Sequence, residues 1–316
     1  MATVSSDWSV WGLTARVVVR GGTDGDTAAA ARTIVQSHVD DVDRAASRFR
    51  ADSEVRLWPD DGLPHPASAT LGFLIDGALA AARLTDGDVD PTLAPAMDAL
   101  GYDADLARIR PNSGGNDVVP RIDRLPSGDG AWLNIRRSEG QLTLPRSTRL
   151  DLGATAKAIT ADRAASDVAE QLGCDVLVEL GGDISTAGLG DEGWEVLVQD
   201  LPSEPAQQVH LAARSGLATS STLRRRWMRG GRPMHHILDP RSALPVEPTW
   251  RTVSVAAHDC LTANAYSTAA IVRGTRAETW LSELGVSARL VGERGRVVTT
   301  GFWPEDVALS GQVAHG

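Results

Sequence analysis

Hydrophobic side chains recur every three to four residues in several stretches of the chain, and this spacing predicts amphipathic helices. Residues 27–46 and 69–84 show it, with small and apolar side chains gathered on one face. A third helix should follow Asp151 and end before Gly173, because a glycine just past the last helical residue is a common stop signal. Shorter helices are expected over residues 96–101, from Cys260 onward and over residues 275–284.

Runs rich in β-branched residues lie between these helices and predict short strands. The expected strands cover residues 10–20, 132–135, 141–144, 175–180, 194–198, 209–213, 251–257, 288–291 and 296–300. Because neighbouring strands alternate with strand–helix units without a strict βαβ rhythm, we expect an α+β fold with mixed or antiparallel sheets and packed helices.

Composition and charge narrow the class of protein. The chain has 316 residues, of which 42% are hydrophobic, and a formal net charge of −10. That charge argues against nonspecific binding of nucleic acid, which depends on Lys and Arg contacts to phosphate. No apolar run approaches the roughly 20 residues of a membrane span. Residues 1–13 lack the features of a secretion signal, so we expect a cytoplasmic protein.

The length allows one large domain or two smaller ones. Residues 112–130 are rich in Gly, Asp and Pro without any period, which predicts a flexible connection or insertion. The two cysteines, Cys174 and Cys260, are expected to be free buried thiols in preference to a disulfide.

The segment from Asp151 to Lys157 lies where a strand is expected to lead into a helix. Helix N-termini present unpaired N–H groups and a partial positive charge, which suit phosphate. Gly153 and Ala154 would let a ligand approach the backbone, and Lys157 adds a point charge. The alternative is an ordinary helix cap by Asp151 beside a surface lysine.

A second polar cluster occupies residues 235–268. His236 can move a proton or contact phosphate near neutral pH, although a structural histidine is the commoner outcome. Asn264 and Thr268 are four residues apart and share one helix face, with Ser267 beside them. Oxygen is the ligand type that hard divalent cations take, yet without a carboxylate this spacing does not by itself identify a metal site.

Three other patterns allow more than one interpretation. Gly181-Gly182-Asp183 predicts a tight turn with positive φ, which serves either a close ligand approach or simply the turn. The basic residues between Arg224 and Arg232 either bind an anionic substrate or form a solvated loop. The acidic run from Asp86 has Met97 at position 12, where an EF-hand needs glutamate, so a calcium loop of that type is excluded.

Seven short segments of this sequence occur in a recognisable order. They are Asp52-Ser53-Glu54, residues 86–95, 151–158, 180–183, 219–221 and 236–243, and finally Ser254-Val255 with Asp259-Cys260 and residues 263–268. Together they resemble the motifs of the ApbE family of flavin transferases, over nearly the whole chain. Any single segment carries little information, and the specificity comes from their number and order.

The resemblance implies one domain over residues 1–316, with an active-site cleft between two subdomains. It implies Mg²⁺-dependent transfer of FMN from FAD to a Thr or Ser hydroxyl of an acceptor protein, with release of AMP. The metal ligands it implies are Ala154, Asn264, Ser267 and Thr268. The FAD contacts it implies are Val89, Asp90, Asp151, Lys157 and Leu238, with His236 handling a proton or contacting phosphate.

The chain departs from the family pattern at several of these positions. Asn264 stands where the family has a metal-binding Asp, which removes one negative charge from the site. Ala158 and Ser221 replace glycines, residues 11–13 read Trp-Gly-Leu in place of Met-Gly-Thr, and Phe49 replaces a tyrosine. Two alternatives therefore stay open: an FAD pyrophosphatase in which water attacks, and an FAD-binding protein with a degenerate metal site and no turnover.

Overall fold

The structure is a computed structural model that describes residues 3–21, 25–103, 130–201, 204 and 206–304. Its centre is an eight-stranded sheet with the order β1-β2-β6-β7-β10-β15-β16-β17. The strands are β1 (Thr3–Val10), β2 (Leu13–Arg20), β6 (Asp175–Leu180), β7 (Asp183–Ala187), β10 (Gly216–Ser221), β15 (Trp250–Ala257), β16 (Ser287–Gly292) and β17 (Val297–Thr300). Every neighbouring pair in this sheet is antiparallel, which confirms the predicted α+β class.

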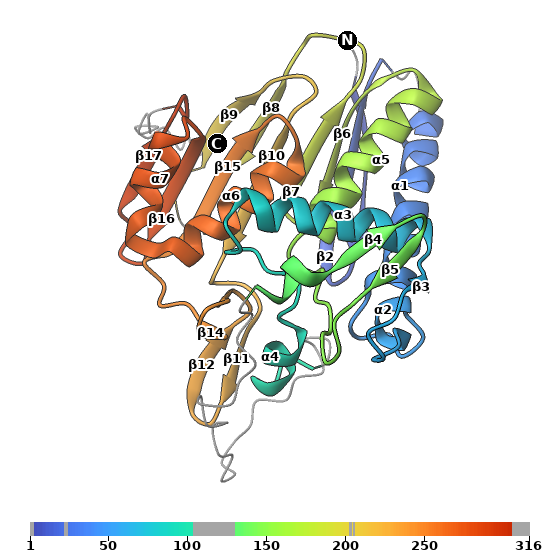
Figure 1. Ribbon diagram of the computed structural model, residues 1–316. Helices are drawn as coiled ribbons and strands as arrows, with labels where there is room; N and C mark the ends of the chain where they lie inside the picture. Colours follow the sequence, from blue (N-terminus) through green and yellow to red (C-terminus); the bar gives the residue numbers. More distant parts are fainter. Residues whose placement is uncertain (1–2, 22–24, 104–129, 202–203, 205, 305–316) are drawn as a thin grey trace.

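Helices cover one face of this sheet (Figure 1). They are α1 (Gly25–Ala46), α5 (Ala156–Leu172) and α6 (Cys260–Arg273), with α3 (Ala69–Leu84) packed across them and α7 (Ala277–Glu283) beside the last strands. The opposite face packs against a two-stranded hairpin of β8 (Trp194–Val198) and β9 (Gln207–Leu211). The sheet is thus the middle of three layers.

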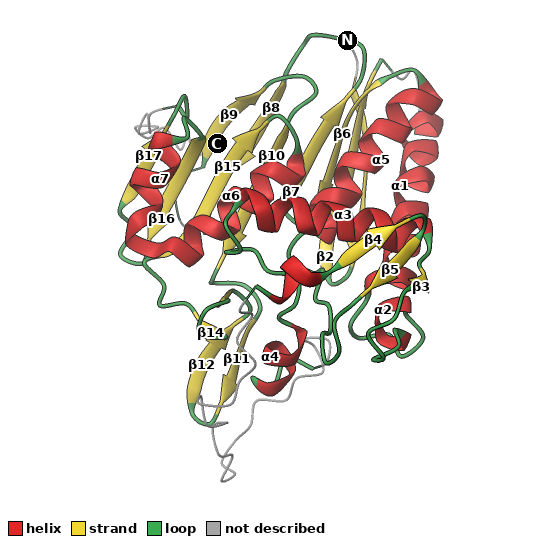
Figure 2. Cartoon of the chain, viewed as in Figure 1, coloured by secondary structure: helices red, strands yellow, loops and turns green. Residues whose placement is uncertain are grey.

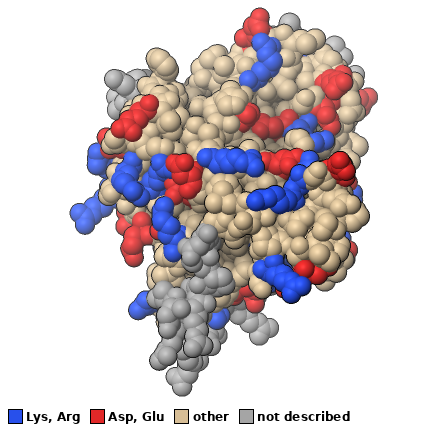
Figure 3. Space-filling model, in the orientation of Figure 1, with Lys and Arg blue, Asp and Glu red and all other residues tan. Residues whose placement is uncertain are grey.

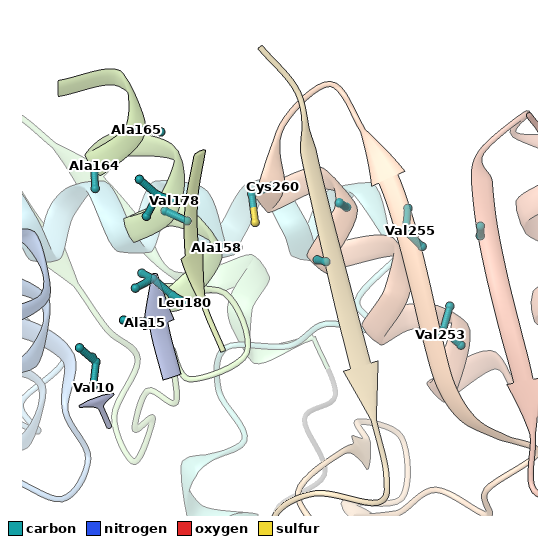
Figure 4. Packing of buried hydrophobic residues seen from close by; sticks show 14 of the residues in the cluster. Val10, Ala15, Ala158, Ala164, Ala165, Val178, Leu180, Val253, Val255 and Cys260 are labelled. Carbon is teal, nitrogen blue, oxygen red and sulfur yellow. The ribbon is translucent and has the colours of Figure 1, made fainter. Parts of the chain in front are cut away.

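The sequence of β6 shows how the two faces are divided. Val176, Val178 and Leu180 point toward the helices and belong to the main core cluster, whereas Leu177 belongs to the cluster under the β8–β9 hairpin. This is the period-two alternation of a strand that is buried on both faces. Figure 4 shows Val178 and Leu180 packed near the small side chains of α5.

Smaller elements gather at one end of the sheet, at the bottom of Figures 1 and 2. They are α2 (Glu54–Leu57), β3 (His65–Pro66), α4 (Ala94–Ala99), the 3₁₀ helix η3 (Ala131–Asn134), β4 (Arg136–Ser138), β5 (Gln141–Thr143), β11 (Arg226–Arg229), β12 (Arg232–His235), β13 (Leu238–Asp239) and β14 (Leu244–Pro245). A separate cluster of α4, β11 and β12 side chains, including the stacked rings of Tyr102 and Trp227, gives this part its own core.

Several sequence predictions agree closely with these bounds. The helix expected over residues 69–84 is α3, and Gly173 ends α5 in the left-handed conformation expected of a C′ glycine. The hairpin predicted near residue 293 is β16–β17.

One predicted strand is wrong, a second is right only from Leu13 onward, and one predicted segment lies almost wholly outside the described residues. Residues 132–135 lie mostly in the 3₁₀ helix η3, because a four-residue apolar run has no periodicity that separates a strand from a helical turn. Residues 10–20 are not one strand, since Trp11 and Gly12 turn β1 into β2. Of the predicted insertion at 112–130, the structure describes only Gly130.

Cys174 and Cys260 are both free thiols, and burial raises the pKa of the Cys260 thiol well above its ordinary value. No helix among the described residues is long and apolar enough to cross a membrane, and the cytoplasmic location stays a prediction. On the face shown in Figure 3, basic and acidic side chains are interspersed, without a large basic field.

One half-buried carboxylate joins α5 to α6. Asp162, in the second turn of α5, accepts hydrogen bonds from the backbone N–H groups of Cys260 and Leu261, both at 3.0 Å, and from the Ser185 hydroxyl at 2.6 Å. Asp259, the N-cap residue of α6, accepts the next N–H of the helix, from Thr262, at 2.6 Å. The donors that an α-helix leaves unpaired at its start are therefore met by two carboxylates, one of them from another helix.

Replacing Asp162 by Ala should lower the free energy of unfolding by about 2–4 kcal/mol, because it leaves two partly buried N–H donors without their acceptor. Urea denaturation would measure the loss. Asp167→Ala on the same helix is the control, since its carboxylate is 38% exposed and pairs with His38, and it should cost under about 1 kcal/mol. Equal losses in the two variants would contradict the proposed link between the helices.

Candidate active site

A cavity of about 1230 Å³ lies between the start of α5, one face of α6 and the smaller elements at the end of the sheet. It exceeds the roughly 300–1,000 Å³ usual for small-molecule sites. Its lining includes all the site residues predicted from the sequence except Ser267: Val89, Asp90, Asp151, Ala154, Lys157, His236, Leu238, Asn264 and Thr268. Residues more than a hundred positions apart therefore face one space.

The loop before α5 is shaped by Asp151. Its Oδ1 accepts the backbone N–H of Gly153 at 2.9 Å, and its Oδ2 pairs with Arg48 Nε at 3.0 Å. Helix α5 begins only at Ala156, after Thr155 at the N-cap, so the alternative of Asp151 as the helix cap is wrong. The loop leaves Ala154 exposed at the cavity wall.

A buried carboxylate, Asp183, connects Lys157 on α5 with Asn264 on α6. Its Oδ2 forms an ion pair with Lys157 Nζ, and its Oδ1 lies 3.4 Å from the Asn264 Nδ2 that donates to it. The remaining amide oxygen, Asn264 Oδ1, is buried and has no hydrogen-bond partner among the described residues. An acceptor left in this state costs about 1–3 kcal/mol, so the atom suits a ligand that supplies positive charge.

Asp183 reaches this position through the turn between β6 and β7. Gly181 and Gly182 have φ values of 63° and 93°, which confirms the predicted positive-φ turn. A side chain at Gly181 would also meet Leu13 of the adjacent hairpin at 2.6 Å. The two glycines thus let the sheet turn tightly and place the buried Asp183 carboxylate between Lys157 and Asn264, behind the cavity wall.

The hydroxyl groups of α6 are tied to strand β10. Ser220 Oγ lies 2.9 Å from Ser267 Oγ and 2.8 Å from Thr268 Oγ1. Ser267 is fully buried, and its hydroxyl donates to the Asn264 carbonyl at 3.0 Å. Thr268 lines the cavity, whereas Ser267 lies behind it.

His236 lies in a setting that disfavours its charged form. Its Nδ1 is buried with no hydrogen-bond partner in the described part of the chain. Burial, followed by the positive charges of Arg225, His235 and Lys157, holds the pKa of His236 well below its ordinary value of 6.5. The imidazole is therefore neutral at physiological pH and able to accept a proton.

The loop after α3 contributes Val89 and Asp90 to the wall. Asp90 Oδ1 accepts the Thr92 N–H at 2.7 Å and the Thr92 hydroxyl at 2.6 Å, while Oδ2 is buried and unpaired among the described atoms. Burial raises the pKa of Asp90. Asp88 next to it pairs with Arg241 at 3.0 Å and with Arg273 of α6, which anchors the loop. Leu238 is buried and completes the apolar side of this wall.

Two of the departures from the family pattern change the cavity wall. Trp11 has a φ of 50° in the two-residue turn between β1 and β2, and it lines the cavity with Leu13. Phe49 also lines it and packs edge-on against Tyr102, with ring centroids 5.6 Å apart. This part of the wall is aromatic and lacks a phenolic hydroxyl at position 49.

Sequence reasoning did not find the partners that orient the site. Asp183 was visible as part of a Gly-Gly-Asp turn, but its ion pair with Lys157 joins residues 26 positions apart. Arg48 pairs with Asp98 at 2.9 Å and with Asp151, and no local spacing signals either contact. Polar residues buried by tertiary contacts need the fold before they can be paired.

Three residues that line the cavity carry oxygen atoms that suit a hard divalent cation. Ala154 offers a backbone carbonyl, Asn264 its unpaired Oδ1, and Thr268 a hydroxyl, which are the oxygen ligands that Mg²⁺ prefers. Among the described residues, no group of three or more His, Cys, Asp or Glu side chains is placed to hold a metal. A cation at this position would therefore be held by neutral oxygens, one of them hydrogen-bonded through its amide to Asp183.

Comparisons with solved structures support the fold. The ApbE protein from Thermotoga maritima has a TM-score of 0.79 at 23% identity, and the match covers 95% of this chain and 97% of that one. The apo flavinyl transferase ApbE from Pseudomonas stutzeri has a TM-score of 0.78 at 23% identity, with 95% of each chain covered.

The chain is also similar in sequence to proteins of known activity. The FAD:protein FMN transferases of Escherichia coli K12 and Salmonella typhimurium LT2 are 23% and 24% identical to the chain, over 90% of it and 83% of their own lengths. The model of the ApbE family matches residues 11–290, which is most of the sequence. The chain belongs to the ApbE family.

Proposed function

We propose that this protein transfers FMN from FAD to a Thr or Ser hydroxyl of an acceptor protein, in a reaction that depends on Mg²⁺ and releases AMP. The observation that supports this most is the meeting of Ala154, Asn264 and Thr268 in one cavity, with the buried Asn264 Oδ1 unpaired among the described residues. The names of the relatives, which act on FAD and protein, supply the substrate class.

Mg²⁺ bound between the loop before α5 and the face of α6 would neutralise charge on the FAD diphosphate. The Ala154 carbonyl, Asn264 Oδ1 and the Thr268 hydroxyl are the proposed ligands. Ser267 was expected as a further ligand, but its hydrogen bonds to Asn264 and Ser220 suit it better to holding Thr268 and Asn264 in place.

FAD is proposed to lie along the cavity against Val89, Asp90, Asp151, Lys157 and Leu238. The acceptor hydroxyl approaches beside His236, whose neutral imidazole takes the hydroxyl proton. The hydroxyl oxygen forms a bond to the phosphorus of the FMN phosphate, the anhydride bond to the AMP phosphate breaks, and AMP leaves. Most of the rate enhancement then comes from positioning and charge stabilisation.

The first experiment incubates the protein with FAD and Mg²⁺, with and without synthetic peptides that carry one Thr or Ser. AMP together with flavin-labelled peptide supports transfer, and the matched Ala peptide should stay unlabelled. AMP together with free FMN in all samples would instead identify a pyrophosphatase. FAD bound without AMP would identify a flavin-binding protein and contradict both enzymatic functions.

Replacing Asn264 by Asp should tighten Mg²⁺ binding about tenfold or more, a difference of at least ~1.4 kcal/mol, because it adds a negative charge at a proposed ligand. Titration calorimetry with Mg²⁺ measures this without turnover. Asn264→Ala, which removes the oxygen, should weaken binding. Unchanged Mg²⁺ affinity in both variants would show that the ion binds elsewhere.

The transfer rate should be level from pH 8 to about pH 6.5 and fall only in more acidic solution, because the lowered pKa keeps His236 deprotonated over that range. His236→Gln should lower the rate by about 10²–10⁴-fold, as removal of a proton acceptor does. His210→Gln is the control, because the His210 side chain on β9 is exposed and outside the cavity lining. A rate that declines with a midpoint at or above 6.5 would show that His236 is not the group that titrates, or is not neutral.

A further inference from the structure

Cations line the cavity on several sides, and most of them are already paired. Arg16 pairs with Asp7, Arg48 with Asp98 and Asp151, Arg50 with Asp43 and Asp52, and Lys157 with Asp183. Arg224 and Arg225 also line the cavity, yet neither has an ion pair or side-chain hydrogen bond in the described chain. Arg224 and Arg225 are thus the cavity-lining cations left without a protein partner among the described residues.

The two arginines differ in their surroundings. Arg224 is exposed and has an acidic neighbour, because its charge acts on Glu179, another lining residue. Arg225 is half-buried, and its positive charge helps to lower the pKa of His236. A neutral imidazole carries no negative charge that could neutralise the guanidinium. Arg225 therefore places an uncompensated positive charge beside the group assigned to proton transfer.

The backbone at Arg225 is held in an unfavourable conformation. Its φ is 51°, in the left-handed region, which costs a residue with a Cβ roughly 1–2 kcal/mol. The chain is held on both sides of Arg225. Before it, the Leu223 N–H donates to Ser221 Oγ at 3.1 Å. After it, β11 begins at Arg226, and Trp227 Nε1 in this strand donates to the Leu100 carbonyl at 2.8 Å. Strain that the surroundings maintain is typical of functional positions.

We propose that Arg225 binds the phosphate that is transferred, and so acts as a further catalytic residue beside His236; this rests on the proposed function. A guanidinium presents a planar fork that matches two non-bridging phosphate oxygens. Charge on those oxygens is what an enzyme must stabilise during phosphoryl transfer. The FAD phosphate supplies the anion that Arg225 lacks in the protein itself.

The test compares Arg225→Asn with Arg226→Gln. Asparagine tolerates left-handed backbone, so Arg225→Asn removes the guanidinium without adding strain. Arg226 is the adjacent exposed arginine and does not line the cavity. Binding of FAD and of riboflavin, which has no phosphate, is measured by flavin fluorescence, and AMP release from FAD with Mg²⁺ and peptide gives the rate.

Arg225→Asn should lower the rate of AMP release by about 10²–10³-fold, as loss of a charge-stabilising donor does. It should weaken FAD binding and leave riboflavin binding unchanged, and added guanidinium should restore part of the rate. Arg226→Gln should match the wild type. A rate within about twofold of the Arg226→Gln protein, or an equal loss of FAD and riboflavin binding, would overturn the proposal.

These outcomes are separate from failure of the proposed function. If the wild-type protein binds FAD but releases no AMP, flavin transfer is wrong, and the ratio of FAD to riboflavin affinity still decides the role of Arg225. If the wild-type protein is active and Arg225→Asn equals Arg226→Gln, only the assignment of Arg225 falls.

Discussion

The hydrogen bonds from the start of α6 to Asp162 of α5 set the geometry on which the site depends. Asp162 takes the N–H groups of Cys260 and Leu261, and burial raises its pKa. The cost of burying this carboxylate is offset by three hydrogen-bond donors and by the positive end of the helix dipole. Gly216 of β10 lets the start of α6 pack close to the sheet, since a side chain at position 216 would lie 2.2 Å from the Cys260 backbone nitrogen. Once the two helices are joined at this point, Lys157 and Asn264 both reach Asp183.

Asp183 then organises the charges. A neutral Asn at position 264 brings less negative charge to the proposed metal site than a carboxylate would. Here its amide nitrogen donates to Asp183, so the carboxylate orients the amide and leaves Oδ1 unpaired and buried. Lys157 offsets the charge of Asp183. The cavity-lining cations without an ion pair among the described residues are Arg224 and Arg225.

Local signals in the sequence predicted much of the fold. The helix over residues 69–84 and the stop at Gly173 follow from periodicity and a C′ glycine, which act within a few residues. Strand β1 was missed because Ser and Asp occupy an edge strand that is mostly exposed or half-buried. Residues 132–135 were mistaken for a strand because short apolar runs have no clear period.

For the site, too, the sequence predicted some features and not others. Ordered motifs predicted which residues share the cavity, including Asp151 and Thr268. They could not predict that Asp151 pairs with Arg48, that Lys157 is held by Asp183 or that Ser267 lies behind Thr268, because those contacts exist only after the helices pack. Spacing identifies the candidates, and tertiary contacts decide what each side chain is able to do.

We propose that a single divalent ion and the FAD diphosphate meet between the loop before α5 and the face of α6. A crystal structure with FAD and Mn²⁺ in place of Mg²⁺ tests this most directly, since anomalous scattering locates the ion. The account predicts one anomalous peak within bonding distance of the Ala154 carbonyl, Asn264 Oδ1 and the Thr268 hydroxyl, and in contact with the diphosphate. A bound diphosphate with no ion there, or with the ion held by other residues, would contradict it.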